Sequence, residues 1–221
     1  MSKAARLPAS RILLTGGGGF VGGYLAPMLA HAAPAARKVV LSRDPASIKG
    51  WDLALCDIVD ASTVAALVQD LRPDLVVHLA AQSSVGASHH AGEDTWRVNL
   101  CGSLALAAAC ARFAPEAVVL FSSSAEGYGK SFLAGAVDEH APLEPQNSYA
   151  RSKAAAEHML DDVLAPTNAL IVARAFNHTG PGQDERFVLP SFSFNSTGAT
   201  LPIRRSHVSP WRSAAVRYFD P

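Results

Sequence analysis

A tyrosine and a lysine four residues apart, Tyr149 and Lys153, stand near the start of a helix-like segment. Side chains at this spacing lie on the same face of a helix. An unperturbed phenol titrates near about 10, and a nearby cation favours its ionised form and lowers that pKa. Ser124, at the end of a strand-like segment, could hold a substrate oxygen. Together the three residues could pass a proton while an alcohol and a ketone interconvert and a nicotinamide carries the hydride.

A glycine-rich turn precedes this group in the chain. Gly16, Gly19 and Gly22 follow the pattern G-x-x-G-x-x-G between an apolar run and a helix-like segment. A turn without side chains lets the backbone approach a pyrophosphate, which the N-terminus of the following helix attracts. A glycine run can equally be a flexible loop, and Tyr-x-x-x-Lys pairs also arise by chance. The order of glycine turn, serine triplet 122–124 and Tyr-x-x-x-Lys favours a dinucleotide site.

The elements that would position these residues alternate along the chain. Apolar runs predict strands at 12–14, 38–41, 53–57, 73–81, 117–121 and 169–173, and helices at 20–32, 61–71, 95–113 and from about Asn147. This alternation predicts an α/β fold, a Rossmann-type doubly wound, mostly parallel sheet with helices on both faces. Ligands then bind outside the carboxyl ends of the strands, where the polar segments fall.

The end of the second strand is where such a fold selects its cofactor. An acidic side chain there would accept a hydrogen bond from the ribose of NAD. This chain instead has Ser42 and Arg43, a hydroxyl and a guanidinium that suit the 2′-phosphate of NADP. An ordinary solvated loop arginine is the alternative, so NADP is favoured and NAD stays open.

Composition narrows the class of protein. The 221 residues are 49% apolar, 17% charged and carry no net charge, which argues against nucleic acid or an anionic membrane as a partner. Three cysteines without C-x-x-C spacing are expected in the core, and His89-His90 lacks a third ligand, so no metal site is expected. With neither a signal peptide nor a membrane-length apolar run, we expect a cytoplasmic protein.

Several stretches carry a family resemblance. The matching segments are 15–22, 56–58, 78–85, 98–99, 122–129 and 149–153. In these the chain resembles the extended short-chain dehydrogenases/reductases of the NAD-dependent epimerase/dehydratase type, which act on nucleotide-diphosphate sugars. Within that family, residues 174–183, with Phe187-Val188 following, most resemble the GDP-4-dehydro-6-deoxy-mannose reductases.

The resemblance implies a role for each matched residue. Tyr149 would be the catalytic acid/base, Lys153 would lower its pKa and hold the nicotinamide ribose, and Ser124 would bind the sugar oxygen. With Ser42 and Arg43, cofactor contacts would come from Gly16, Gly19, Phe20, Val21, Gly22, Asp57, Ile58, Leu79, Ala80 and Ala81. Substrate contacts would come from Ser83, Ser124, Asn177 and Arg186. Glu126 stands where 4,6-dehydratases carry the glutamate that removes the C5 proton, so it is a further catalytic candidate.

The resemblance therefore implies NAD(P)H-dependent reduction of the C4 keto group of a GDP-linked 4-keto-6-deoxy sugar. Another nucleotide-sugar enzyme, a GDP-mannose 4,6-dehydratase or a 4-epimerase, is the first alternative. A non-catalytic dinucleotide-binding protein is the second, although it would have no use for Ser124, Tyr149 and Lys153. Family members often pair through the helices that hold Asn99 and Tyr149, so a homodimer is also expected.

The match ends near Phe192. We expect residues 1–192 to form the dinucleotide-binding domain and residues 193–221, which show no clean strand or helix period, to form an atypical tail. Family members continue into a substrate domain, which is expected to be truncated here. Without that domain the chain can still bind its cofactor, but the sugar nucleotide loses remote binding energy that supports the chemical step.

Overall fold

The computed structural model describes residues 7–45, 48–83, 92–184 and 214–219. They contain a seven-stranded sheet in the order β3-β2-β1-β4-β5-β6-β7. Its strands are β1 (Arg11–Thr15), β2 (Arg37–Ser42), β3 (Asp52–Leu55), β4 (Leu75–His78), β5 (Val118–Ser124), β6 (Ala169–Ala175) and β7 (Ala214–Phe219). Strands β1 to β6 are parallel, and β7 runs antiparallel to β6. The predicted Rossmann-type sheet is confirmed.

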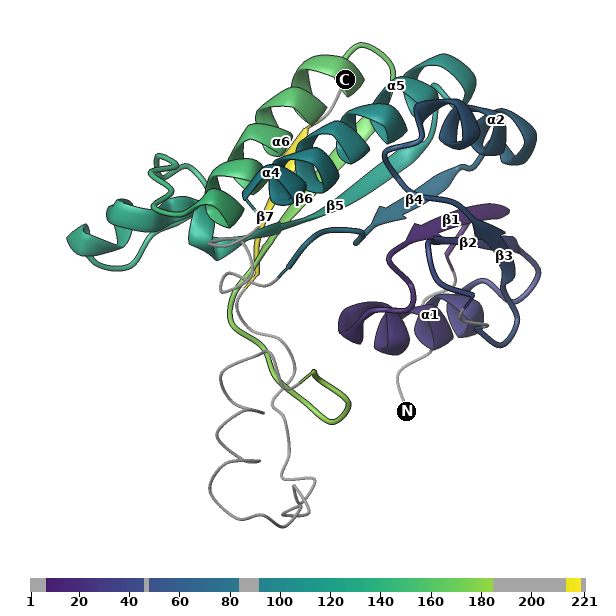
Figure 1. Ribbon diagram of the computed structural model, residues 1–221, viewed down its shortest axis with the longest axis horizontal. Helices are drawn as coiled ribbons and strands as arrows, with labels where there is room; N and C mark the ends of the chain where they lie inside the picture. Colours follow the sequence, from purple (N-terminus) through teal and green to yellow (C-terminus); the bar gives the residue numbers. More distant parts are fainter. Residues whose placement is uncertain (1–6, 46–47, 84–91, 185–213, 220–221) are drawn as a thin grey trace.

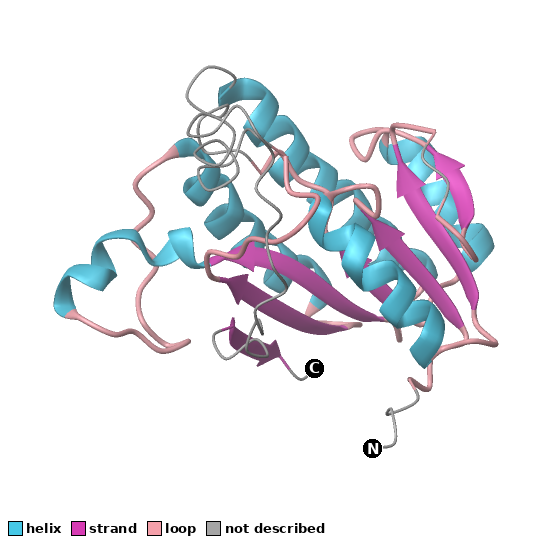
Figure 2. Cartoon of the chain, turned by 90° about the horizontal axis from the view of Figure 1, so that it is seen from below, coloured by secondary structure: helices cyan, strands magenta, loops and turns pink. Residues whose placement is uncertain are grey.

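Helices cover both faces of this sheet (Figure 1). The helices α2 (Ala61–Leu71), α4 (Gly92–Trp96), α5 (Ser103–Phe113) and α6 (Ser148–Leu164) lie on one face, and α1 (Phe20–Ala32) lies on the other. Figure 2 shows the strands running between these two layers. A π-helical turn, η1 (Arg97–Gly102), joins α4 to α5. The predicted helix 95–113 is therefore present, interrupted by a π-helical turn in which Asn99 is buried.

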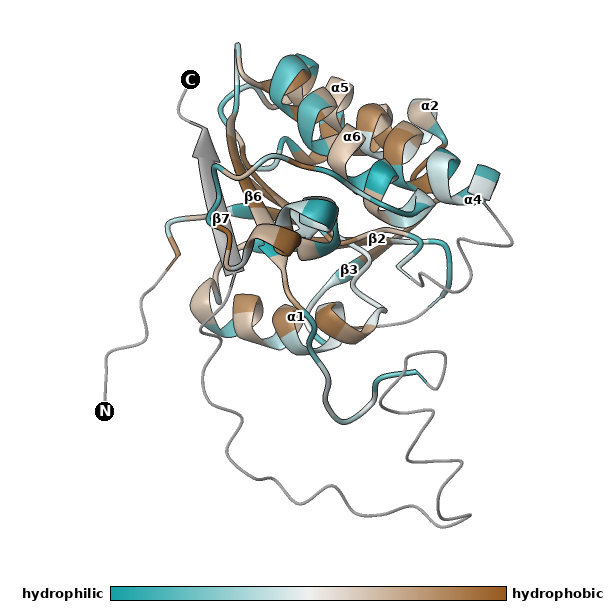
Figure 3. Ribbon diagram, turned by 90° about the vertical axis from the view of Figure 1, so that its left-hand side faces the viewer, coloured by the Kyte–Doolittle hydropathy of each residue, from teal (hydrophilic) through white to brown (hydrophobic). Residues whose placement is uncertain are grey.

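Two apolar clusters hold the layers together. The larger lies under α2, α5 and α6 and includes the buried side chains of Leu13, Phe121 and Leu160. The smaller lies under α1 and includes Leu14 and Trp51. Figure 3 shows brown, apolar stretches on α1, α5 and α6, as expected for helices that each bury one stripe against a sheet. Of the three cysteines, Cys56 and Cys110 are buried, but Cys101 is exposed, so the expectation of a core position is wrong for Cys101.

The order of the strands indicates where on the sheet a ligand would bind. Strands β1, β2 and β3 succeed one another in one direction, whereas β4, β5 and β6 extend in the other. The order therefore switches between β1 and β4, and in open α/β sheets the ligand crevice lies at the carboxyl ends of the strands at such a switch. The glycine-rich turn follows β1 at this point.

The tail contains a strand that the sequence did not predict. Residues 214–219 form β7, which pairs with β6 in a register that joins Ala175 to Ala214 and Leu170 to Phe219. The expectation that residues 193–221 contain no regular element is wrong here, because pairing with the free edge of β6 depends on backbone hydrogen bonds and needs no alternating pattern. The same register means that the chain leaves and re-enters the sheet at the carboxyl edge.

In the described residues, no helix is long and apolar enough to cross a membrane. The same residues hold no group of three histidine, cysteine or acidic side chains that could bind a metal ion. His89 and His90 lie outside the described residues.

Candidate active site

The glycine-rich turn is packed too closely for side chains. Gly16 has φ +72°, and a Cβ at this position would lie 2.6 Å from the amide nitrogen of Ala80 and 2.8 Å from the carbonyl carbon of Leu79. A Cβ on Gly22 would lie 2.5 Å from the carbonyl oxygens of both Gly16 and Gly17. The turn thus brings the end of β1, the end of β4 and the start of α1 together as a backbone cradle.

The start of α1 suits an anion. Gly19 is the N-cap residue and forms no side-chain cap hydrogen bond, and the first turn carries no acidic residue. The first N–H groups of a helix lack intrahelical acceptors and carry partial positive charge. Phe20 and Val21 begin this helix and are half-buried, as are Leu79, Ala80 and Ala81 at the end of β4. The cradle and the open helix end fit the pyrophosphate of a dinucleotide.

A chain of buried hydroxyls fixes the end of β4 against the glycine turn. His78 Nε2 lies 2.9 Å from Ser103 Oγ, whose own hydrogen is donated to the carbonyl oxygen of Asn99 at 2.6 Å. The imidazole therefore donates from Nε2, and its Nδ1 accepts from Thr15 Oγ1 at 2.7 Å. Thr15 Oγ1 in turn accepts from the amide of Ala80 at 3.1 Å. Both ring nitrogens of His78 are therefore paired with side-chain hydroxyls, one from β1 and one from α5.

The candidate adenosine contacts lie at the ends of β2 and β3. Ser42 Oγ accepts from the amide of Asp44 at 3.1 Å, and Arg43 is exposed. Asp57 is half-exposed and lies 3.9 Å from the Arg97 guanidinium. The side chain of Ile58 is in the core. Contact between Ile58 and a bound adenine would therefore use its backbone.

Two catalytic candidates are held at the start of α6. Asn147 caps this helix by accepting from the amide of Ala150 at 2.8 Å. Lys153 is only 3% exposed, and its Nζ donates to the carbonyl oxygen of Ser122 at 2.7 Å and lies 4.7 Å from the centroid of the Phe121 ring. Burial lowers the pKa of Lys153 to about 8, and the carboxylate of Glu157 opposes that fall.

Tyr149 and Ser124 face each other across the gap between α6 and the end of β5. Burial of the Tyr149 phenol raises its pKa, a hydrogen bond with Ser124 acts the other way, and the negative charge of Glu126 raises it further. The sequence predicted a Tyr149 pKa lowered by Lys153. That direction is wrong for this structure, because burial of the phenol outweighs the stabilisation of its ionised form.

Glu126 belongs to the same group of residues. Its backbone N–H donates to Ser124 Oγ at 3.2 Å, and its carboxylate accepts from Asn147 Nδ2 at 3.3 Å. The residue that caps α6 therefore also holds the glutamate. Glu126 is exposed, so its carboxylate is open to solvent at the edge of the site.

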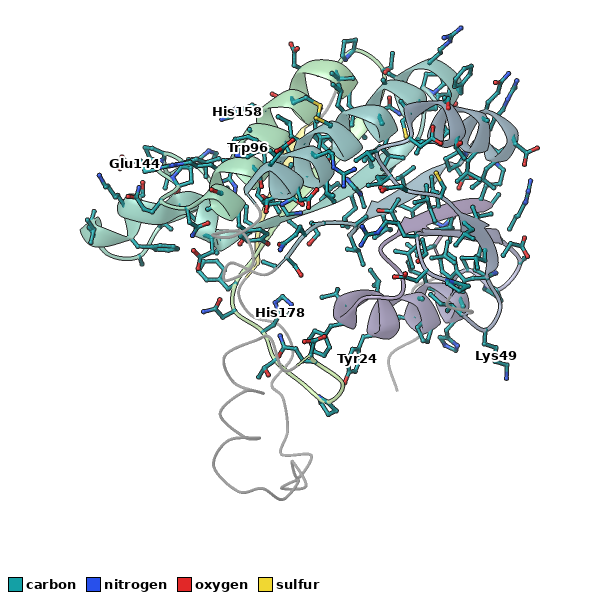
Figure 4. The ribbon with its side chains drawn as sticks, viewed as in Figure 1. Tyr24, Lys49, Trp96, Glu144, His158 and His178 are labelled. Carbon is teal, nitrogen blue, oxygen red and sulfur yellow. The ribbon has the colours of Figure 1, made fainter. Side chains whose placement is uncertain are left out.

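The segment after β6 reaches across to α1. The His178 ring stacks on Phe20, with centroids 6.0 Å apart and planes 4° from parallel, and the Tyr24 hydroxyl donates to the carbonyl oxygen of Pro181 at 2.8 Å. Figure 4 shows His178 and Tyr24 beside the start of α1. Asn177 is exposed in this segment, and Ser83 is exposed after β4. Arg186 lies outside the described residues.

The sequence did not predict which residues hold α6, the helix of Tyr149 and Lys153, in place. Asn99 Oδ1 accepts from the amide of Gln82 at 2.8 Å, and its Nδ2 donates to Ser152 Oγ at 2.9 Å. Glu157 forms a buried ion pair with Arg174, the two joining atoms being 2.7 Å apart. Asn99, Glu157 and Arg174 are polar residues within largely apolar segments. The sequence could have marked them as structural on that ground, because polar side chains are buried only when they are hydrogen-bonded.

The backbone cradle at Gly16 and Gly22, the open N-terminus of α1 and the group of Ser124, Tyr149 and Lys153 all lie at the carboxyl edge of a Rossmann-type sheet. The sequence profile of the NAD dependent epimerase/dehydratase family matches residues 12–196. The chain belongs to this family, whose members include nucleotide-sugar epimerases, dehydratases and reductases.

Individual relatives span these activities. A GDP-6-deoxy-D-mannose reductase of Pseudomonas aeruginosa is 34% identical over 184 residues, which are 82% of this chain and 56% of that protein. A human dTDP-D-glucose 4,6-dehydratase is 31% identical, over 83% of this chain and 55% of that protein. A UDP-glucose 4-epimerase of Thermus thermophilus, solved in complex with NAD, superposes with a TM-score of 0.71 at 32% identity, covering 79% of this chain and 58% of that one. The chain thus spans slightly more than half the length of these relatives.

Proposed function

We propose that this chain carries the cofactor-binding and catalytic residues of a reductase that converts the C4 keto group of a GDP-linked 4-keto-6-deoxy sugar to an alcohol. The observation that carries the proposal is the arrangement of Ser124, Tyr149 and Lys153. Tyr149 shares a hydrogen bond with Ser124, and the buried Lys153 lies one helical turn further along α6. The similarity to the GDP-6-deoxy-D-mannose reductase supports the choice of substrate.

The residues present fit a nicotinamide dinucleotide. Gly16 and Gly22 would admit its pyrophosphate to the backbone cradle, and the N-terminus of α1 would hold the charge. Ser42 and Arg43 favour NADP over NAD, with Arg43 free to reach a 2′-phosphate from the end of β2. Lys153 would bind the ribose next to the nicotinamide. When bound, the cofactor supplies the hydride for the reduction.

Three side chains of this protein would then bind the carbonyl group and transfer the proton to it. Ser124 would hold the carbonyl oxygen of the sugar, and Tyr149 would protonate the same oxygen as negative charge develops on it. A raised pKa keeps the Tyr149 phenol protonated at neutral pH, which is the state that a proton donor requires. The cation of Lys153 would then stabilise the phenolate that remains.

One observation favours a 4,6-dehydratase as the second candidate. Glu126 is held by Asn147 and lies close enough to Tyr149 for its charge to raise the Tyr149 pKa. A carboxylate in that place could remove the C5 proton of a 4-keto sugar before water is eliminated. The similarity to the human dehydratase supports this alternative as well.

One set of measurements separates these functions from dinucleotide binding alone. Cofactor affinity is measured first by titration with NADPH and NADH. The protein is then incubated with GDP-4-keto-6-deoxy-mannose and NADPH, and separately with GDP-mannose and NADP. Oxidation of NADPH supports the reductase, and consumption of GDP-mannose supports the dehydratase. Cofactor binding with neither reaction would overturn both in favour of a binding protein.

A further inference from the structure

A buried polar cluster lies beneath the catalytic residues. It consists of Ser123 on β5, Tyr128 in the 3-10 helix η2 (Ala125–Ala134), Glu157 on α6 and Arg174 on β6. Glu157 is 6% exposed and Arg174 is 2% exposed, and Ser123 and Tyr128 are also buried. Burying two charges costs several kcal/mol per ion unless they are well paired, so a cluster of this kind needs an explanation.

The carboxylate of Glu157 is the centre of the cluster. Arg174 donates to its Oε2 from Nη2 at 2.7 Å and from Nε at 3.0 Å, and Ser123 donates its hydroxyl hydrogen to Oε1. The remaining Arg174 nitrogen, Nη1, donates to the Tyr128 hydroxyl at 3.1 Å and to the carbonyl oxygen of Glu139 at 3.0 Å. Glu157 therefore connects α6 to β5 directly, and to β6 and η2 through Arg174.

The contact between Glu157 and β5 is the third of three contacts that α6 makes with the same strand. Tyr149, Lys153 and Glu157 are spaced by four residues, so they lie on one face of α6. Each contacts one residue of the serine triplet: Tyr149 the hydroxyl of Ser124, Lys153 the carbonyl oxygen of Ser122, and Glu157 the hydroxyl of Ser123. The first two contacts hold the catalytic residues, and the third has no part in the reaction proposed above.

We propose that Glu157, held by Ser123 and Arg174, is a positioning residue for the proton relay. It fixes the register of α6 against β5 and places a negative charge one helical turn from the Lys153 ammonium. The proposal rests on the reductase function as far as turnover is concerned, but the effect on Lys153 does not depend on any substrate.

The charges that face Lys153 can be named for each element packed against it. On α6 they are Glu157 and the Tyr149 phenol, and Glu126 of η2 lies beyond the phenol. On β4, His78 is neutral at ordinary pH, because burial and the Lys153 charge lower its pKa to about 3. On β6, Arg174 carries a positive charge that Glu157 neutralises. Burial lowers the Lys153 pKa, and Glu157 is the anion that acts against this lowering.

The test uses Glu157→Gln, Glu157→Asp and Ser123→Ala in the full chain. The titration of Lys153 is followed by NMR of protein carrying 13C-labelled lysine, with the Lys153 signal assigned from its loss in Lys153→Met. In Glu157→Gln the titration midpoint of Lys153 is expected to shift to lower pH. In Glu157→Asp, which keeps the negative charge, the midpoint is expected to return most of the way to its wild-type value. Asp70→Asn, which breaks the surface ion pair with Arg37, serves as the matched control and leaves the midpoint in place.

Ser123→Ala keeps the ion pair and removes one hydrogen bond, so it remains informative if Glu157→Gln does not fold. We expect kcat to fall about tenfold with little change in KM, since small errors in the placement of catalytic groups cost up to about 10²-fold.

A merely structural pair would lower the melting temperature in Glu157→Gln without moving the Lys153 midpoint. This result, or an unchanged kcat in Ser123→Ala, overturns the proposal. Absence of reductase activity in the unmodified chain, with the midpoint shift present, would reject the reductase function and leave the link between Glu157 and Lys153 standing.

Discussion

The ammonium group of Lys153 donates a hydrogen bond to the backbone carbonyl oxygen of Ser122 at 2.7 Å. Ser122 lies two residues before Ser124 on β5, and Lys153 lies four residues after Tyr149 on α6. This hydrogen bond is one of three contacts that hold α6, with the proposed proton donor Tyr149, against β5, with the proposed substrate-binding hydroxyl of Ser124. It also keeps a cation in a site with little access to water.

Lys153 is expected to make stability depend on pH at the alkaline side. Its pKa falls from an ordinary value of 10.5 to about 8 in the folded protein. Below pH 8 both states carry the ammonium, and the folded state bears the full cost of burying it. Between pH 8 and 10.5 the folded protein releases its proton first, so the free energy of unfolding rises through this window, by up to roughly 3 kcal/mol. Denaturant unfolding of the wild type and of Lys153→Met at about pH 7.5 and about pH 10 checks this; equal pH dependence in both proteins would contradict it.

Tyr149→Phe is expected to remove the proton donor and keep the fold. General acid catalysis contributes about 10²- to 10⁴-fold, so kcat for NADPH oxidation with the keto sugar should fall by that order. The phenol is not part of the apolar core, so the melting temperature should change little. NADPH affinity, measured by fluorescence titration, is the control and should stay near the wild-type value. Full activity in Tyr149→Phe would show that another group delivers the proton.

Gly16→Ala and Gly23→Ala are expected to act in opposite directions. Alanine at position 16 would need φ +72° and would place its Cβ 2.6 Å from the amide nitrogen of Ala80, so we expect at least about 2 kcal/mol of destabilisation and loss of cofactor binding. A Cβ at position 23 meets no described atom within 4 Å, and Gly23 lies inside α1. Alanine there should stabilise the protein by about 0.5–1 kcal/mol. Urea unfolding and NADPH titration of both variants test the pair; similar effects at the two positions would contradict the close packing of the turn.

Local patterns account for what the sequence predicted. The strand–helix alternation, the turn at Gly16 and the i, i+4 spacing of Tyr149 and Lys153 are all visible within short stretches. The Glu157–Arg174 pair joins α6 to β6, and the direction of the Tyr149 pKa depends on how far the phenol is buried, so both require the tertiary structure. Strand β7 depends on the free edge of β6 in the same way.

His78 is expected to make the folded protein sensitive to acid. Burial is the main reason that its pKa lies at about 3 instead of 6.5, followed by the charge of Lys153. Above pH 6.5 the imidazole is neutral in both states. As the pH falls from 6.5 towards 3, only the unfolded chain takes up the proton, so the free energy of unfolding declines by up to about 4 kcal/mol. His78→Gln should unfold more easily at neutral pH, since Thr15 and Ser103 lose well-placed partners, but its stability should fall less between about pH 7 and about pH 4.5. Equal pH slopes for the two proteins would show that other groups cause the acid sensitivity.

Arg43 is expected to decide between the two nicotinamide cofactors. It is exposed at the carboxyl end of β2, next to Ser42, and no acidic side chain stands at these two positions to accept from a ribose hydroxyl. A charge-assisted hydrogen bond to a phosphate contributes about 1.5–3 kcal/mol, so Arg43→Ala should weaken NADPH binding by roughly ten- to a hundredfold and leave NADH binding nearly unchanged. Arg37→Ala is the matched control, because Arg37 lies at the amino end of the same strand and pairs with Asp70 at 3.1 Å. If Arg43→Ala weakens both cofactors equally, or neither, the 2′-phosphate is not read by this side chain and the preference for NADP fails with it.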